Sequence, residues 1–174
     1  MRNFEAIKNK IHSLTSIKEL SDIWKDKGEK LVFTNGCFDL LHLGHITYLS
    51  EAADLGTKLI VGINSDISVR GLDKGASRPI KDEETRLNIM ASLQFVDAVV
   101  MFEEQTPFNL IQSILPHVLV KGGDYNASET DLLSKKYIIG SDVVAINGGK
   151  TEVISFLPGH STTKLENKII ESLK

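Results

Sequence analysis

The sequence feature that most constrains the fold is an apolar run that ends in a glycine turn and is followed by two histidines. Residues Leu31–Phe33 are apolar, the turn Thr34-Asn35-Gly36 follows, and a helical pattern opens near His42. This order predicts a buried strand, a loop and the beginning of a helix. The first turn of a helix offers unpaired backbone N–H groups and the positive end of the helix dipole. The loop is therefore suited to hold an anion such as phosphate.

His42 and His45 are three residues apart, so on a helix they lie on the same face and can reach the same anion. Gly44 between them has no side chain, and a ligand can approach the backbone closely there. As imidazolium ions or as neutral N–H donors, the two rings can stabilise negative charge on a phosphoryl group. The alternative is a pair of surface histidines on an amphipathic helix, which their position after the glycine turn disfavours.

Further apolar runs alternate with helical patterns along the chain, which predicts an α/β fold with a Rossmann-like parallel sheet of about five strands. A strand, a helix and a second strand form a right-handed unit, so the strands run parallel and their carboxyl ends meet at one edge. The expected strands are Lys30–Thr34, Lys58–Ile63, Val96–Phe102, Val118–Val120 and Val143–Ile146, with a short final strand at Val153–Phe156.

Helical spacing also marks the beginning of the chain. The first expected helix carries its apolar residues at Phe4, Ile7, Ile11 and Leu14, and the second is expected to begin at the cap Ser16 and to stop at Gly28. We therefore expect an N-terminal helical extension over residues 1–28 and a main domain over residues 29–174.

Polar residues follow the second predicted strand at the same edge of the sheet. Asn64 and Asp66 come directly after the apolar run that begins at Lys58. Ligands of parallel sheets bind beyond the carboxyl ends of the strands. We therefore expect Asn64 and Asp66 to face the same cleft as Thr34 and His42.

Three more segments could each contact a phosphate or could be an ordinary loop or cap. The irregular stretch between Ser68 and Ile80 carries Lys74 and Arg78, and basic residues in a loop are often only solvated. The run Lys121-Gly122-Gly123 joins a positive charge to accessible backbone at a strand end, although Gly-Gly by itself indicates a turn. The run Ser161-Thr162-Thr163 opens the last predicted helix, where hydroxyls act as N-caps or, with the backbone N–H groups, bind a second phosphate.

The composition excludes several other classes of protein. The formal charge of −3 disfavours sequence-independent binding of nucleic acid, which needs a basic surface. No apolar run is long enough to cross a bilayer, so we expect no membrane partner and a cytoplasmic protein. The single cysteine, Cys37, excludes an internal disulfide and fits a reducing compartment. A catalytic thiol at Cys37 is the alternative, but direct attack by a phosphate needs no protein nucleophile.

The stretch from Thr34 to His45 resembles the His-x-Gly-His signature of the nucleotidyltransferase superfamily, and more narrowly its cytidylyltransferase-like branch. Together with Lys121-Gly122-Gly123-Asp124-Tyr125, it is most similar to the heptose 1-phosphate adenylyltransferases. Ser161-Thr162-Thr163 resembles the Ser-Thr-Thr motif that helps to hold the β- and γ-phosphates in cytidylyltransferase-like enzymes. The resemblance covers almost the whole chain, although Lys164-Leu165-Glu166-Asn167 is more polar than the continuation of that motif in the family.

The resemblance implies a role for each matching position. It implies catalytic roles for His42, His45 and Lys121. It implies nucleotide binding by Thr34, Asn35, Gly36, Cys37, Phe38, Gly44, Arg86, Gly122, Gly123, Asp124, Ser161, Thr162 and Thr163. It implies binding of the acceptor by Asp39, Asn64, Asp66, Lys74 and Arg78. For Arg86, the alternative is a plain surface arginine paired with Asp82.

The reaction that the resemblance implies is transfer of AMP from ATP to a sugar 1-phosphate. The expected acceptor is D-glycero-D-manno-heptose 1-phosphate, and the products are ADP-heptose, a precursor of lipopolysaccharide core, and pyrophosphate. Mg²⁺ would bridge the phosphates, with no metal-binding residue of the protein. We also expect a homodimer, and a separate sugar kinase upstream, since the chain has no room for one and lacks the Gly-x-x-x-x-Gly-Lys-Ser/Thr loop of P-loop kinases.

Two other functions stay open. One is a cytidylyltransferase for glycerol 3-phosphate or a similar alcohol phosphate, which shares the histidine and Ser-Thr-Thr motifs. The other is a non-catalytic module that senses nucleotides, which loss of either histidine would have favoured. The residues alone leave the base preference and the sugar anomer open.

Overall fold

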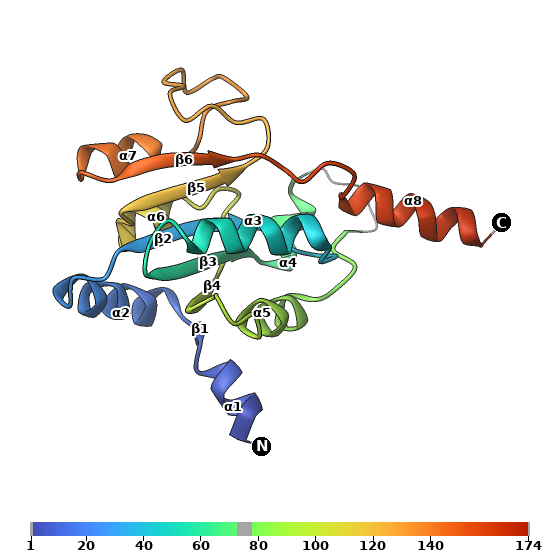
Figure 1. The fold of residues 1–174 in the computed structure, drawn as a ribbon, viewed down its shortest axis with the longest axis horizontal. Helices are drawn as coiled ribbons and strands as arrows, with labels where there is room; N and C mark the ends of the chain where they lie inside the picture. The colour runs from blue at the N-terminus through green and yellow to red at the C-terminus, as the bar shows by residue number, and fades with distance from the viewer. Residues whose placement is uncertain (1, 73–77, 174) are drawn as a thin grey trace.

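The structure is a computed structural model that describes residues 2–72 and 78–173 (Figure 1). The helices are α1 (Arg2–Lys8), α2 (Leu14–Asp26), α3 (Leu43–Ala53), α4 (Asp66–Arg70), α5 (Glu83–Ala91), α6 (Phe108–Ile114), α7 (Ser141–Ile146) and α8 (Thr162–Ser172). The strands are β1 (Ile11–His12), β2 (Leu31–Gly36), β3 (Lys58–Asn64), β4 (Ala98–Phe102), β5 (Val118–Gly122) and β6 (Lys150–Ile154). Over these two described ranges, no helix has the length and apolar character needed to span a membrane.

The strands form one parallel sheet in the order β1-β4-β3-β2-β5-β6, which confirms the predicted α/β fold and gives six strands where about five were expected. From β2 the chain adds β3 and β4 on one side and then β5 and β6 on the other. The sheet therefore has its switch point between β2 and β5, where connections leave in opposite directions and open a crevice for a ligand.

Both faces of the sheet are buried, because helices pack on each of them. Neighbouring residues of β2 point to opposite faces, as the pleat of a strand requires. Val32 packs in one core with Leu49 of α3, whereas Phe33 packs in the other with Ile17 of α2 and Ile111 of α6. Burial on both faces explains why this strand is a continuous apolar run and does not alternate.

The predicted strand at Val143–Ile146 is wrong, since these residues belong to α7. A four-residue apolar run does not distinguish a strand from a short helix. Gly140 precedes the helix with φ +84°, and Val144 is buried while Ile146 is 85% exposed, which is a helical pattern of burial. The last strand of the sheet is instead β6, and it pairs parallel with β5.

The prediction of a helix through Ile11 is also wrong, because Ile11 and His12 form the edge strand β1 beside β4. Helix α2 then begins after the cap Ser13 and not at Ser16. The Ser13 hydroxyl accepts a hydrogen bond from the Ser16 amide at 3.1 Å, and the Ser16 hydroxyl accepts one from the Ser13 amide at 3.0 Å. This reciprocal pair is a capping box. The division of the chain at residue 28 stays a prediction.

Candidate functional site

A cleft of about 810 Å³ lies at the carboxyl ends of β2 and β5, where the order of the strands places the crevice. It brings together most of the residues singled out from the sequence. The predicted residues that line it are Asn35, Gly36, Cys37, Phe38, Asp39, His42, Gly44, His45, Asn64, Arg78, Lys121, Gly122, Ser161, Thr162 and Thr163.

The two histidines stand at the beginning of α3. His42 is the N-cap, with the extended backbone angles φ −142° and ψ 171°, and His45 lies in the first helical turn. Their rings are stacked, with centroids 3.8 Å apart and planes inclined by 22°, and the edge of Phe38 packs near His45 at 5.4 Å. Phe38 itself has φ +48°, a region that non-glycine residues seldom occupy and that often accompanies a functional site.

Burial, and secondarily the nearby charge of His160, lowers the pKa of His42. As the pH falls, the unfolded chain therefore takes up a proton at His42 at a higher pH than the folded protein does. The stability that His42 contributes is complete above its ordinary pKa of 6.5 and is lost as the pH falls through the lower folded value.

We expect the urea midpoint of the ligand-free protein to fall between pH 7.5 and pH 5.5, and His42→Gln to reduce that fall, because glutamine does not titrate. Equilibrium unfolding at the two pH values measures both effects. An equal fall in the two proteins would assign the dependence to His12 and His117, whose pKa values burial also lowers.

Lys121 places a positive charge at the end of β5, in the strand next to the one that leads to the histidines. Its Nζ donates a hydrogen bond to Asn35 Oδ1 at 2.5 Å and lies 5.8 Å from the centre of the Tyr125 ring. Gly122 is required at this point, because a Cβ there would lie 2.5 Å from the ring of Phe156. The glycine thus allows an aromatic ring to pack over the end of β5.

Helix α8 presents its N-terminus to the same cleft as α3. The Ser161 hydroxyl is the cap and accepts a hydrogen bond from the Lys164 amide at 3.2 Å, while Thr162 is the first residue of the helix. Two helix N-termini and the imidazoles of His42, His45 and His160 therefore border one cavity, together with the charged groups of Lys121, Arg78, Asp39 and Glu166. This arrangement is suited to a ligand with several negative charges.

Arg86 is a buried residue with internal contacts, and its predicted role in nucleotide binding stays a prediction. Its side chain is fully buried below the cleft, where it donates hydrogen bonds to the carbonyl groups of Lys81, Cys37 and Asn64. It also forms an ion pair with the Asp66 carboxylate at 2.7 Å. The predicted pairing of Arg86 with Asp82 on the surface is therefore wrong, and neither Arg86 nor Asp66 lines the cleft. The guanidinium instead joins the loop after β2, at Cys37, to the end of β3, at Asn64.

The other predicted residues outside the lining have structural contacts or open positions. Thr34 is buried, and its hydroxyl lies 2.6 Å from that of Tyr48, which donates a hydrogen bond to the Val120 carbonyl at 3.3 Å. Burial raises the pKa of Tyr48, so this hydroxyl stays protonated. The Gly123 amide donates a hydrogen bond to Ile154 of β6, and Asp124 is exposed. Lys74 lies outside the described residues.

An apolar and aromatic wall of the cleft was missed from the sequence. It is formed by Tyr125, Tyr137, Ile139 and Phe156. His160, just before α8, adds a further imidazole to the lining of the cleft. Tyr125 and Phe156 each follow a strand by only a few residues, which is the signal that could have identified them. Aromatic rings at this end offer a surface for a planar, apolar group of a ligand.

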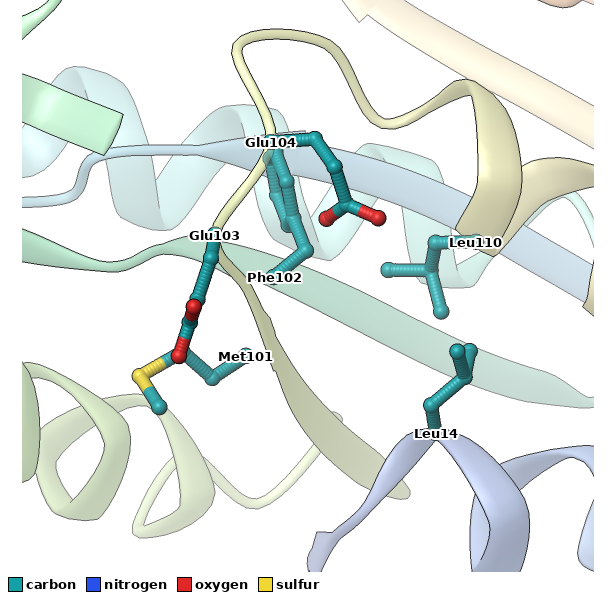
Figure 2. Close-up of a pocket in the computed structure, with 6 residues that line it drawn as sticks. All are labelled: Leu14, Met101, Phe102, Glu103, Glu104 and Leu110. Carbon is teal, nitrogen blue, oxygen red and sulfur yellow. The ribbon is translucent and has the colours of Figure 1, made fainter. Parts of the chain in front are cut away.

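A second hollow of about 510 Å³ lies between the end of β4 and helices α2 and α6 (Figure 2). Leu14, Phe102 and Leu110 supply apolar surface, and Glu103 and Glu104 supply two carboxylates. These carboxylates repel a phosphate, and among the residues that the structure describes no histidine, lysine or arginine lines this hollow. The cleft at the histidines is therefore the candidate site. Residues 2–72 and 78–173 contain no group of three or more His, Cys, Asp or Glu side chains placed to hold a metal ion.

Comparison with known proteins agrees with the sequence motifs and the fold. The family described as cytidylyltransferase-like matches residues 33–166. The bifunctional protein HldE of Geobacter metallireducens is 45% identical over 163 residues, covering 94% of this chain and 31% of the relative. HldE of Geotalea uraniireducens is 47% identical over 160 residues, covering 92% of this chain and 31% of the relative. The chain thus spans about a third of the length of these curated relatives.

Two solved structures share the fold. One is a lipopolysaccharide core biosynthesis protein from Thermoplasma volcanium, with a TM-score of 0.59 and 28% identity, covering 75% of this chain and 98% of that one. The other is a pantoate-β-alanine ligase from Francisella tularensis, with a TM-score of 0.54 and 19% identity over 94% of this chain and 78% of that one, a likeness of fold alone. The family match extends from β2 to α8 and includes every segment that borders the cleft, so the chain belongs to the cytidylyltransferase-like family.

Proposed function

We propose that this chain is a nucleotidyltransferase that transfers AMP from ATP to a sugar 1-phosphate, with D-glycero-D-manno-heptose 1-phosphate as the acceptor. The observation that carries the proposal is the convergence of His42, His45, Lys121 and the N-terminus of α8 on one cleft. The similarity to HldE proteins and to a lipopolysaccharide core biosynthesis protein supports a sugar nucleotide as the product.

In the proposed reaction, a phosphate oxygen of the acceptor attacks the α-phosphorus of ATP. The new P–O bond forms in line with the bond to the β-phosphate, which breaks and releases pyrophosphate. The protein supplies no nucleophile, so its contribution is to position two anions and to stabilise the charge that shifts between them. Magnesium enters with the substrate as MgATP, because phosphate oxygens are the ligands that it prefers.

Each element of the cleft has a task in this scheme. His42 and His45 donate hydrogen bonds to the phosphoryl group that is transferred. Lys121, at the end of the neighbouring strand β5, neutralises charge on the triphosphate. Ser161, Thr162, Thr163 and the first amides of α8 hold the leaving pyrophosphate. The wall of Tyr125, Tyr137, Ile139 and Phe156 accommodates the base.

In this proposal a separate sugar kinase supplies the acceptor, which carries a phosphate at C1. The HldE relatives are named bifunctional proteins, which fits two linked activities in those proteins. A homodimer stays a prediction, which light scattering on the purified protein would check.

The test is a screen for release of pyrophosphate, with each of the four nucleoside triphosphates against both anomers of heptose 1-phosphate and against glycerol 3-phosphate. We expect turnover with ATP and a heptose 1-phosphate. Turnover with CTP and glycerol 3-phosphate would support the alcohol-phosphate cytidylyltransferase that the family also contains. Binding of ATP without release of pyrophosphate from any pair would indicate a sensing module.

The Ser-Thr-Thr segment gives a prediction that separates capping from catalysis, because the structure assigns the cap to Ser161 alone. Thr162→Val keeps the shape and deletes the hydroxyl. We expect it to lower kcat/KM for ATP at least about tenfold, or about 1.4 kcal/mol, with a melting temperature within a few degrees of the wild type.

The matched variant is Ser161→Ala, which should lower the melting temperature because loss of a cap costs about 0.5–2 kcal/mol. Steady-state kinetics and thermal melts on both proteins make the comparison. Normal turnover of the Thr162→Val protein would refute the proposal that this hydroxyl contacts a phosphate.

A further inference from the structure

Arg78 is held between two carboxylates that come from distant parts of the chain. Its Nη1 lies 2.8 Å from Asp39 Oδ2, in the loop after β2, and its Nη2 lies 2.9 Å from Glu166 Oε2, on α8. All three side chains line the cleft. The Arg78 guanidinium therefore faces two carboxylates at this corner of the cleft, where the Lys81 ammonium group also lies, 2.9 Å from the Asp39 carbonyl oxygen.

The two carboxylates differ in how firmly they are held. The Asp39 side chain is 3% exposed, and it also accepts hydrogen bonds from the amides of Ile80 and Lys81, each at 2.8 Å. Burial would raise the pKa of Asp39, but the hydrogen bonds from these amides and from Arg78 outweigh it and lower the pKa. Removal of this carboxylate would leave two amides and a guanidinium without their acceptor, so Asp39 is a permanent partner of Arg78.

Glu166 is held much more loosely. Its side chain is 26% exposed, and Arg78 is the one partner that its carboxylate has among the described residues. Helix α8, which carries it, buries none of its residues and extends away from the sheet (Figure 1). About a quarter of the Glu166 side chain is exposed, so water can solvate its carboxylate when this ion pair opens, and Asp39 still compensates the charge of Arg78. The carboxylate of Glu166 can therefore leave Arg78 more easily than that of Asp39.

We propose that Glu166 is a placeholder for the phosphate of the acceptor, and that this phosphate displaces it from Arg78 while Asp39 keeps the guanidinium in position. The proposal rests on the proposed function in that the displacing anion is the acceptor phosphate. A phosphate oxygen takes the position of Glu166 Oε2 at Nη2, so one charge-assisted hydrogen bond replaces another. Arg78 then distinguishes a phosphorylated sugar from a free one, and Asp39 is its positioning residue. Asp39, predicted to bind the acceptor, does so only through Arg78.

The exchange also explains why a carboxylate of α8 faces a cleft that is suited to anions. A phosphate dianion beside both carboxylates would face strong repulsion at short range, whereas the same dianion in place of Glu166 meets a guanidinium that is only half neutralised. Without a ligand, Glu166 pairs with the Nη2 group of Arg78, whose side chain is 12% exposed, so this group is not left without a partner. The site is thus prepared for an anion before one arrives.

The experiment measures binding alone, by calorimetric titration of inorganic phosphate into the protein saturated with magnesium and α,β-methylene ATP, so that the triphosphate position is filled. Glu166→Gln removes the competing charge and keeps the shape, so phosphate should bind about threefold to fivefold more tightly, the range for a partly exposed ion pair. The matched control is Glu171→Gln on the exposed part of the same helix, which should leave the Kd for phosphate unchanged. Arg78→Gln should weaken phosphate binding at least about tenfold, as loss of a charged hydrogen-bond donor does.

The double variant Arg78→Gln/Glu166→Gln should bind phosphate as weakly as Arg78→Gln, since the placeholder acts only through the arginine. Weaker binding to Glu166→Gln would overturn the proposal and make Glu166 a second support for Arg78. Equal binding by all five proteins would also overturn it, because the phosphate would then bind elsewhere. The expected pattern in a protein that releases no pyrophosphate with heptose 1-phosphate would refute the proposed reaction and leave the role of Glu166 intact.

Discussion

His45→Ala is expected to lower kcat by about 10²–10³, the range for loss of one preorganised donor to a transition state. His45 lies in the first turn of α3, lines the cleft, and is held by the stacked ring of His42 and the edge of Phe38. A donor that is aligned before the substrate binds needs no reorganisation as charge develops on the phosphoryl group. The KM for ATP should change much less than kcat, because the proposed contacts of the triphosphate with Lys121 and α8 do not involve His45.

Pre-steady-state release of pyrophosphate, together with equilibrium binding of ATP, measures the two effects separately. His12→Ala is the matched control, since His12 lies in the edge strand β1 and does not line the cleft. It should leave kcat close to that of the wild type. Equal losses of kcat and of ATP affinity in His45→Ala, or no loss of either, would show that His45 has a structural role and does not stabilise the transition state.

Arg86→Met is expected to lower the free energy of unfolding by about 3–5 kcal/mol, the cost of removing one partner of a buried ion pair. The guanidinium is fully buried and lies 2.7 Å from Asp66 Oδ1, 2.6 Å from the Asn64 carbonyl and 2.9 Å from the Cys37 carbonyl. Methionine fills part of the space but donates no hydrogen bond. A carboxylate that is 20% exposed and several carbonyl groups would then lose the donor that they share.

Equilibrium unfolding in urea measures this loss, and Lys18→Met is the control. Lys18 also forms an ion pair, with Asp22 at 3.0 Å, but both side chains are more than half exposed, at 59% and 51%. Its removal should change the urea midpoint very little. An Arg86→Met protein as stable as Lys18→Met would show that Arg86 does not stabilise the contact between the loop after β2 and the end of β3.

The sequence by itself determined the central part of the fold and the position of the cleft. A continuous apolar run, a glycine turn and a helix start are local features, and β2 and α3 form where these features predict them. Parallel strands must bring their carboxyl ends to one edge, so the segments after β2, β3 and β5 were bound to meet once the strands were recognised. His42, at the beginning of α3, therefore lies near Asn64 and Lys121 at the ends of β3 and β5, as the order of the elements along the chain predicts.

Only the tertiary structure decided the features that depend on contacts between distant segments. The strand β1 has two residues, too few for a pattern, and it exists because β4 offers a free edge beside it. The run Val143–Ile146 became helical because β6 occupies the edge of the sheet next to β5, and one helical face of the run could still be buried.

The charged residues show the same limit more sharply. The sequence shows that Arg86, Arg78 and Glu166 are charged, but a charge carries no information about its surroundings. Arg86 is buried because folding brings carbonyl groups from three segments within hydrogen-bonding distance of its guanidinium. Arg78 pairs with Glu166 because α8 begins at the edge of the cleft. Burial and pairing of a charge are properties of the assembled chain, since they depend on which acceptors folding brings within about 3 Å of it.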